Sequence, residues 1–231
     1  MMQDPTAALQ LAAKLEYLEA AFYALGVSAF TTGAQAFTAG ELSAVQQILK
    51  HENAHVTLIK SILGSSAPAQ PASSTYDFTA GSGTKNGPFP AVLTTKAEFL
   101  KVAQLLEDMG VRAYKGQLAS FLGDKSNITT AMQLHQVEAR HAAMIRRLRA
   151  QNAWISGASF DAGYTGSATT AGTQASTAVK VYGVTVTDPL TVSTSEDNRV
   201  QGSVPNQASD SFDEPLATAD VTSFVALFGV T

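Results

Sequence analysis

The 231-residue sequence contains no cysteine. This absence excludes disulfide bonds, thiolate metal ligands and iron–sulfur clusters, although it leaves the redox compartment open. No apolar run is long enough to span a bilayer, so no membrane span is predicted. The opening Met-Met-Gln-Asp-Pro has neither a basic n-region nor an apolar h-region, and therefore carries no export signal. We expect a soluble protein, exported only if a leader peptide stood before Met1.

Charge is also sparse, with 15% charged residues and a formal net charge of −4. The sequence has no basic stripe, so nucleic acid is not expected as a partner. The 45% hydrophobic content is that of an ordinary globular protein. A chain of this length suffices for one large domain with an appendage.

Apolar residues recur at spacings of three and four over the first two thirds of the chain, which is typical of bundle helices. Four helices are predicted, each with a start signal. They begin at Asp4-Pro5, at Thr38 with a capping box to Glu41, at Thr95 with a capping box to Glu98, and near Ser126; the second ends at Gly64 and the fourth near Gln151. The Ser-, Pro- and Gly-rich segment 65–93 is long enough to cross over a bundle. The pattern predicts an all-α core: an up-down-down-up four-helix bundle with one long crossover.

One short motif occurs twice, as Glu52-Asn-Ala-His55 and as Glu138-Ala-Arg-His141, at an offset of 86 residues. A Glu and a His three apart lie on one helix face, about one turn from each other, where both can bind one transition metal. A single such pair is a weak signal, because charged residues pair this way on many solvated faces. Two pairs on apolar stripes, each joined by a Glu from another helix, are typical of a dinuclear carboxylate site in a bundle.

The first and third helices supply the additional acids. They match at an offset of 91, so that Glu16 corresponds to Glu107 and Tyr23 to Tyr114. The chain thus consists of two similar helical hairpins, which predicts pseudo-twofold symmetry around the site. Glu19 breaks this symmetry, because a glycine stands at the matching position 110. We favour Glu16 over Glu19 as the bridging ligand of the first helix, with Glu19 joining one metal or moving protons. The metals would be bridged by Glu16 or Glu107, and by Glu52 or Glu138. The two tyrosines are either core aromatics or hydrogen-bond donors to a ligand carboxylate.

The candidate metal ligands number seven. They are Glu16, Glu19, Glu52, His55, Glu107, Glu138 and His141. Two divalent cations would neutralise the crowded carboxylates, several of which would otherwise take up protons. Oxygen and imidazole donors suit iron or manganese, and zinc would also fit. The alternative is a set of solvated Glu–His pairs, which requires the acids to turn away from their apolar stripes.

Other polar residues are not expected in the site. His51 and His135 are not predicted as ligands, and Asp108 is expected to be solvated or paired with Arg112. Removing one crowded acid, as in Glu138→Ala, is predicted to stabilise the metal-free bundle, since it lowers like-charge repulsion.

The composition changes after Trp154. We predict a bundle over 1–154 and a small β- and loop-rich C-terminal extension over 155–231. Gly, Ser and Thr dominate 156–178, 179–187 alternates as a strand, and 190–194 is its candidate partner. A short helix from Ala219 to Phe228 is expected to pack on the bundle.

These motifs resemble the ferritin-like superfamily, which includes ferritins, bacterioferritins and rubrerythrins. The phrases that carry the resemblance are Leu15-Glu-Tyr-Leu-Glu-Ala-Ala-Phe-Tyr23, Glu52-Asn-Ala-His55, Leu106-Glu-Asp-Met-Gly-Val-Arg-Ala-Tyr114, Val137-Glu-Ala-Arg-His-Ala-Ala143 and Phe212-Asp-Glu-Pro-Leu216. Within the superfamily the sequence is most similar to desiccation-related and stress-response proteins. The resemblance implies a di-iron or di-manganese site and chemistry with oxygen or peroxide. It covers about 5–154 well and the tail thinly.

Two hypotheses follow from the residues and the resemblance. The first is a di-metal oxidoreductase, of oxidase or peroxidase type, that acts in stress protection. The second is a non-catalytic structural or binding protein whose metal site is structural or vacant. A homo-oligomer is compatible with both, and iron storage fits poorly with the Gly- and Ser-rich tail.

Overall fold

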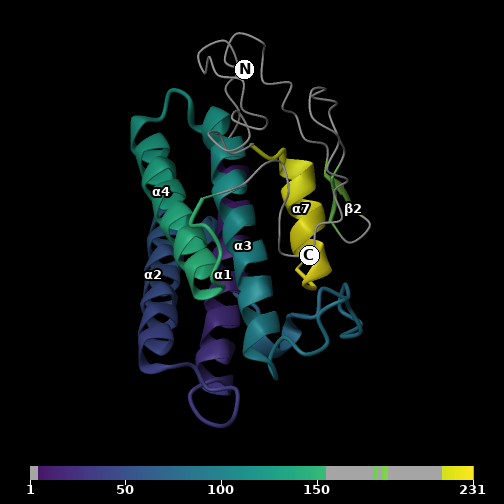
Figure 1. Ribbon diagram of the computed structural model, residues 1–231. Coiled ribbons are helices and arrows are strands. Elements are labelled where there is room, and N and C mark those ends of the chain that lie inside the picture. The colour runs from purple at the N-terminus through teal and green to yellow at the C-terminus, as the bar shows by residue number, and fades with distance from the viewer. Residues whose placement is uncertain (1–4, 155–178, 182–183, 187–214, 231) are drawn as a thin grey trace, which may run out of the picture.

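The computed structural model describes residues 5–154, 179–181, 184–186 and 215–230. Four long helices lie side by side: α1 (Pro5–Ala29), α2 (Ala39–Leu63), α3 (Lys96–Gln117) and α4 (Lys125–Leu148) (Figure 1). A fifth helix, α7 (Thr218–Leu227), lies against α3 and α1. Short 3₁₀ turns are η1 (Gly64–Ser66), η2 (Ser73–Thr75) and η3 (Leu118–Phe121). The described part of the chain is therefore mostly helical, as predicted.

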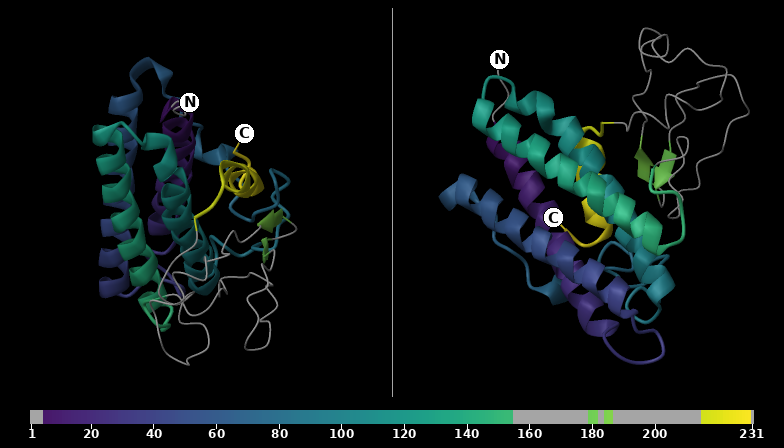
Figure 2. Two further views of the ribbon diagram at one scale, coloured as in Figure 1. Left: turned by 90° about the horizontal axis from the view of Figure 1, so that it is seen from above. Right: turned by 60° about the vertical axis from the view of Figure 1, so that its left-hand side comes forward.

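Successive helices alternate except at the crossover. A short turn reverses the chain between α1 and α2, and another reverses it between α3 and α4 (Figures 1 and 2). The segment from Gly64 to Thr95 instead returns the chain to the end where α2 began. There Lys96 at the start of α3 contacts Glu41 at the start of α2, with Nζ 2.9 Å from Oε2. Helices α2 and α3 therefore run in the same direction, which gives the up-down-down-up order.

Local signals set most helix ends. Helix α1 starts at Pro5, as predicted. The capping box of α2 forms, since Thr38 Oγ1 accepts from Glu41 N at 3.3 Å and Glu41 Oε2 accepts from Thr38 N at 2.7 Å. Gly64 ends α2 with a φ of 55°, a conformation that L side chains rarely adopt. These three predictions are confirmed.

The predicted capping box of α3 is wrong. Thr95 is the N-cap, but its side chain accepts no cap hydrogen bond. Both side chains of the motif bind Ala91 instead: Thr95 Oγ1 donates to its carbonyl, and Glu98 accepts from its N–H. Helix α4 also differs slightly from its prediction. It begins at Lys125, because Asp124 caps it by accepting from Asn127 N at 3.0 Å, and it ends at Leu148.

The crossover contains a tight loop built on one buried aspartate. Asp77 accepts from the backbone N–H groups of Thr79, Gly83 and Lys85 at 3.1, 3.0 and 2.7 Å, and from the Thr79 hydroxyl at 2.6 Å. The backbone of this loop also binds the end of α7, where Asp77 N donates to Phe228 O at 2.9 Å. These hydrogen bonds hold the loop around Asp77 together and connect it to the end of α7.

Helix α7 closes one side of the bundle, which confirms the predicted C-terminal helix. Phe224 and Phe228 are fully buried. The segment before α7 runs along α3, where Leu216 N donates to Arg112 O at 3.1 Å. None of the described helices is both long and apolar enough to cross a bilayer.

The extension contains one small hairpin among its described residues. Strands β1 (Val179–Val181) and β2 (Val184–Val186) pair antiparallel, with Val179 opposite Val186. The prediction of one continuous strand over 179–187 is therefore wrong, because 179–181 and 184–186 are two strands that run in opposite directions. The predicted partner 190–194 and the Gly-, Ser- and Thr-rich stretch lie outside the described residues.

Candidate metal centre

Each helix of the bundle contributes carboxylate or imidazole groups to one buried cluster. The helical period places Glu16 and Glu19 of α1 on the same inward face, and Glu107 of α3 faces them. Helices α2 and α4 add the two Glu–His pairs. All seven candidate ligands are buried, and Glu16, Glu52, Glu107 and Glu138 are fully inaccessible to solvent. The solvated-pair alternative is therefore wrong.

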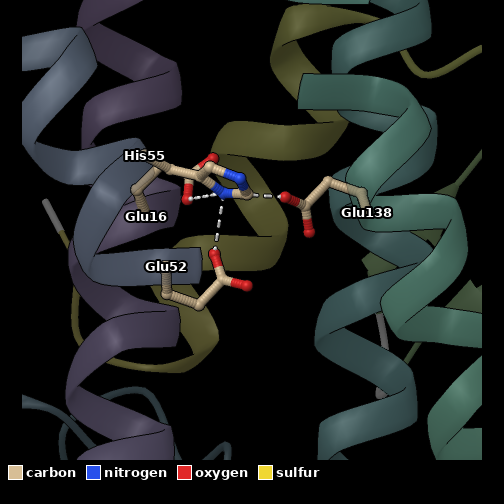
Figure 3. Close-up of side chains that lie close together, drawn as sticks. All are labelled: Glu16, Glu52, His55 and Glu138. Atoms are coloured by element: carbon tan, nitrogen blue, oxygen red, sulfur yellow. Dashed lines mark hydrogen bonds and ion pairs between the residues drawn. The ribbon is translucent and has the colours of Figure 1, made fainter. Parts of the chain in front are cut away.

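One group forms around His55 of α2. Its Nδ1 atom lies 3.2 Å from Glu16 Oε2, 3.1 Å from Glu52 Oε2 and 3.1 Å from Glu138 Oε1 (Figure 3). The three carboxylates come from α1, α2 and α4, and converge on one ring nitrogen. One atom from each of the four residues lies within 4.8 Å of the others, which is a spacing that one metal ion can bridge.

The second group forms around His141 of α4. Its Nδ1 atom lies 2.8 Å from Glu52 Oε1, 3.3 Å from Glu107 Oε2 and 3.7 Å from Glu138 Oε2. These four residues also offer ligand atoms within 4.8 Å of one another. The two groups repeat the pseudo-twofold pattern of the sequence, since Glu16 with His55 corresponds to Glu107 with His141.

The sharing between the groups differs from the sequence interpretation. Glu52 and Glu138 belong to both groups, whereas Glu16 belongs to one. Of the bridging candidates from the sequence, the shared position therefore favours Glu52 and Glu138 over Glu16 and Glu107. Glu19 belongs to neither group, although it is 1% exposed and close to the cluster. It is therefore a neighbouring acid in this arrangement and not one of the convergent donors.

The residues present fit a metal ion. Several buried ligand atoms have no hydrogen bond of acceptable geometry to any described residue, even where a charged partner is within contact distance. They are Glu52 Oε1, Glu107 Oε2, both carboxylate oxygens of Glu138, and His141 Nδ1. Buried polar atoms are normally hydrogen-bonded, so unsatisfied ones require an explanation. A cation held among them would satisfy all five, and their oxygen and nitrogen chemistry suits a divalent transition metal.

Burial and charge separate the pKa values of the cluster. Burial raises the pKa of Glu52 well above its usual value, and it raises that of Glu107 to about 7 against the opposing effect of His141. Burial would also raise the pKa of Glu138, but its contacts with both histidines outweigh burial and lower the pKa to about 2. Burial lowers the pKa of His55, yet contacts with three carboxylates, Glu138 foremost, raise it to about 12. Without metal the cluster thus holds protons on its histidines and on some of its carboxyls.

Two tyrosines donate hydrogen bonds to Glu16 and Glu107, the two carboxylates that each belong to one group only. The Tyr114 hydroxyl donates to Glu16 Oε1, and the Tyr23 hydroxyl donates to Glu107 Oε1. Both bonds join α1 to α3 across the bundle. Of the two sequence interpretations, the hydrogen-bonded one is confirmed. Each tyrosine restrains a carboxylate whose other oxygen faces a histidine.

The histidines outside the motifs differ from each other. His135 Nδ1 contacts Val111 O at 3.0 Å and has no part in either group, which agrees with its exclusion. His51 Nδ1 lies 2.9 Å from His141 Nε2, a contact that the sequence analysis missed. It depends on the register between α2 and α4, which a helical period within one chain segment does not reveal.

Of the two alternatives for Asp108, the solvated one is wrong. Burial raises the pKa of Asp108, whereas nearby positive charges, that of Arg112 among them, act to lower it. Asp108 is 1% exposed, and its Oδ2 atom lies 2.6 Å from Arg146 NH2 on α4. Asp108 therefore also has an arginine partner on the neighbouring helix, which the sequence did not predict, because α4 packs against α3.

The fold and the cluster define a class of protein: a helical bundle with buried carboxylate–histidine groups that could hold metal. A family model described as a ferritin-like domain matches residues 4–151, which is more than half of the chain. The chain therefore belongs to the ferritin-like domain family. No curated protein and no solved structure matches it.

Proposed function

We propose that this protein is a dinuclear-metal carboxylate protein that performs redox chemistry with oxygen or peroxide. The observation that carries the proposal is the pair of four-residue groups that share Glu52 and Glu138. Two adjacent positions with common carboxylates suit two metal ions that act together. Membership of the ferritin-like domain family supports this class of site.

The ligand roles follow from the two groups. Glu16 and His55 would complete one position, Glu107 and His141 the other, and Glu52 and Glu138 would bridge them. Iron or manganese suits these donors, and zinc would also fit. A bound redox-active pair supplies the electrons that reduce oxygen or peroxide.

The protein's own residues would then orient the centre and manage its protons. Tyr23 and Tyr114 keep Glu107 and Glu16 turned toward the metal positions. Glu19 is a buried carboxyl beside the ligands whose pKa is raised well above its usual value by burial and by Glu138. It is therefore suited to hold a proton within the apolar core. The similarity of the motifs to desiccation-related proteins leads us to propose stress protection as the setting.

A second candidate is a structural or binding role with a vacant or structural metal site. One observation favours it: the contacts of His55 with Glu16, Glu52 and Glu138 compensate buried charge without any ion. A bundle that is stable in this form could present other surfaces to a partner. Metal content and oxidase activity separate the two candidates.

The deciding experiment measures metal content and oxygen consumption. The purified protein should contain close to two transition-metal ions per chain, and chelator-treated protein should consume oxygen when ferrous ion is added. His141→Ala should lose bound metal and turnover, because it removes a ligand of one position. The control His135→Ala should match the parent, since His135 contacts the Val111 carbonyl on α3. Full metal content in His141→Ala would contradict the ligand assignment, and a metal-binding protein without oxygen consumption would favour the second candidate.

A further inference from the structure

An imidazole outside the two ligand groups contacts the cluster from the side of α2. His51 Nδ1 lies 2.9 Å from His141 Nε2, and the two rings are nearly parallel, at 11°. His141 therefore has a partner on each ring nitrogen, with carboxylates at Nδ1 and an imidazole at Nε2. His51 is half-buried, and its other nitrogen, Nε2, lies 2.7 Å from the amide nitrogen of the exposed Gln47 side chain.

We infer that His51 is a positioning residue for the His141 metal position, and that it makes the two metal positions inequivalent. The inference rests on the proposed di-metal site and deepens it. A ligating histidine commonly donates its second ring N–H to an outer acceptor, which fixes its tautomer and orientation. Here the acceptor is another imidazole.

The tautomers follow from the geometry. To offer the Nδ1 lone pair to a metal, His141 must carry its ring proton on Nε2. That proton points at His51 Nδ1, which must then accept, so the proton of neutral His51 stays on its own Nε2. In the structure the amide nitrogen of Gln47 faces this ring nitrogen. The tautomer requires the amide to be turned over, so that its oxygen accepts from His51 Nε2; the orientation of an amide is an assignment made from such partners. Metal binding at His141 therefore fixes a hydrogen-bonded series that ends at the exposed Gln47.

The other half of the site lacks this arrangement. The position that corresponds to His51 at the offset of 86 is Val137, which can neither donate nor accept. Within the described part of the chain, no side-chain hydrogen bond reaches His55 Nε2, while its Nδ1 faces three carboxylates. Among the described residues, the orientation of the His55 ring is therefore set by the three carboxylates at its Nδ1 atom and by packing. His51 is therefore a second departure from the pseudo-twofold symmetry, besides Glu19.

The test titrates Mn²⁺ into the chelator-treated parent and three variants, and measures binding by calorimetry. The parent should bind two ions. His51→Leu removes the acceptor, and should weaken one of the two binding events about 10- to 100-fold while the other persists. His51→Asn places an amide oxygen near the former Nδ1 atom, and should restore binding to near the parent value. His135→Leu is the matched control, because it removes a half-buried histidine whose contact is a backbone carbonyl.

A second readout reports the tautomers directly. In the zinc-loaded protein, nitrogen-15 NMR of the imidazoles should show the ring protons of both His51 and His141 on Nε2. A proton on His51 Nδ1 would overturn the inference. So would equal, parent-like binding of both ions by His51→Leu. If that variant fails to fold, His51→Asn decides, since parent-like binding supports the acceptor role and the loss of one ion overturns it. A parent that binds fewer than two ions would overturn the di-metal proposal, and this inference with it.

Discussion

The acids of the cluster differ in what each does for the metal-free protein. Glu138 lies between His55 and His141, with oxygens 3.1 and 3.7 Å from their Nδ1 atoms. Glu19 instead belongs to neither histidine group, and its pKa is raised by burial and neighbouring acids. The like-charge argument from the sequence treats all acids alike, and so predicts stabilisation by Glu138→Ala. The contacts in the structure oppose that prediction.

We therefore expect opposite effects from two substitutions in chelator-treated protein. Glu138→Ala leaves two buried, proton-binding histidines without their shared anion, and should lower the free energy of unfolding by about 3–5 kcal/mol. Glu19→Gln removes an acid that burial and its neighbours already disfavour as an anion, and should leave stability equal or higher. Thermal melting in excess chelator measures both. If Glu138→Ala melts at or above the melting temperature of the parent, the result would support the like-charge argument and contradict this prediction.

The candidate ligands were predictable from sequence because a helical period fixes which residues share a face. The repeat at offsets of 86 and 91 then matched Glu16 to Glu107 and each Glu–His pair to the other. Two facts were not predictable. Glu19 lies on the same stripe as Glu16, and only distances across the bundle exclude it from the groups. The contact of His51 with His141 likewise depends on the register between α2 and α4.

At the scale of elements, the crossover loop depends on Asp77. Burial raises the pKa of this carboxyl, but hydrogen bonds from Thr79, Lys85 and Gly83 outweigh burial and hold the pKa below its usual value of 3.8. A depressed carboxyl pKa contributes stability above the unfolded-state value, and the contribution is lost as the pH falls through the folded-state pKa. The ionised form of Asp77 therefore stabilises the loop at neutral pH and fails to do so in acid.

Asp77→Ala should destabilise the protein by about 2 kcal/mol or more, because three backbone N–H groups and the Thr79 hydroxyl lose a charged acceptor. The difference between variant and parent should persist at neutral pH and shrink as the pH falls below 3.8. Denaturant unfolding at a series of pH values measures it. A difference that is constant down to the lowest pH would show that the charge of Asp77 does not contribute.

The two capping-box motifs of the sequence have different outcomes in the structure. Thr38 with Glu41 and Thr95 with Glu98 have the same spacing, yet only the first pair forms a capping box. In the second case Ala91 lies close, because Thr94 N and Thr95 N both donate to its carbonyl in a tight turn. That turn offers the two side chains alternative partners. A motif therefore predicts a helix start reliably, but its hydrogen bonds depend on the preceding loop.

At the scale of the whole molecule, the C-terminal segment completes the packing around two helical hairpins. Leu216 crosses α3 so closely that a Cβ atom on Gly116 would lie 1.8 Å from the Leu216 carbonyl oxygen. The sequence predicted that a short helix from Ala219 to Phe228 would pack on the bundle. It could not locate this crossing, since a glycine in a helix has several explanations and the partner lies 100 residues away.

Gly116→Ala should therefore push the 215–217 backbone away from α3 and loosen α7. The added methyl group cannot be accommodated by a side-chain rotation, because the opposing atom belongs to the backbone, and overpacking of this kind costs about 1–3 kcal/mol. Hydrogen exchange in a peptide covering 215–230 should become faster, while peptides of α2 and α4 keep their protection and the protein keeps its Mn²⁺ binding. The matched control is Gly40→Ala in the first turn of α2, where no atom lies within 4 Å of the added Cβ. This control should be neutral, or more stable by up to about 1 kcal/mol, since alanine favours the helix. Parent-like exchange over 215–230 in Gly116→Ala would mean that the close crossing does not hold α7 in place.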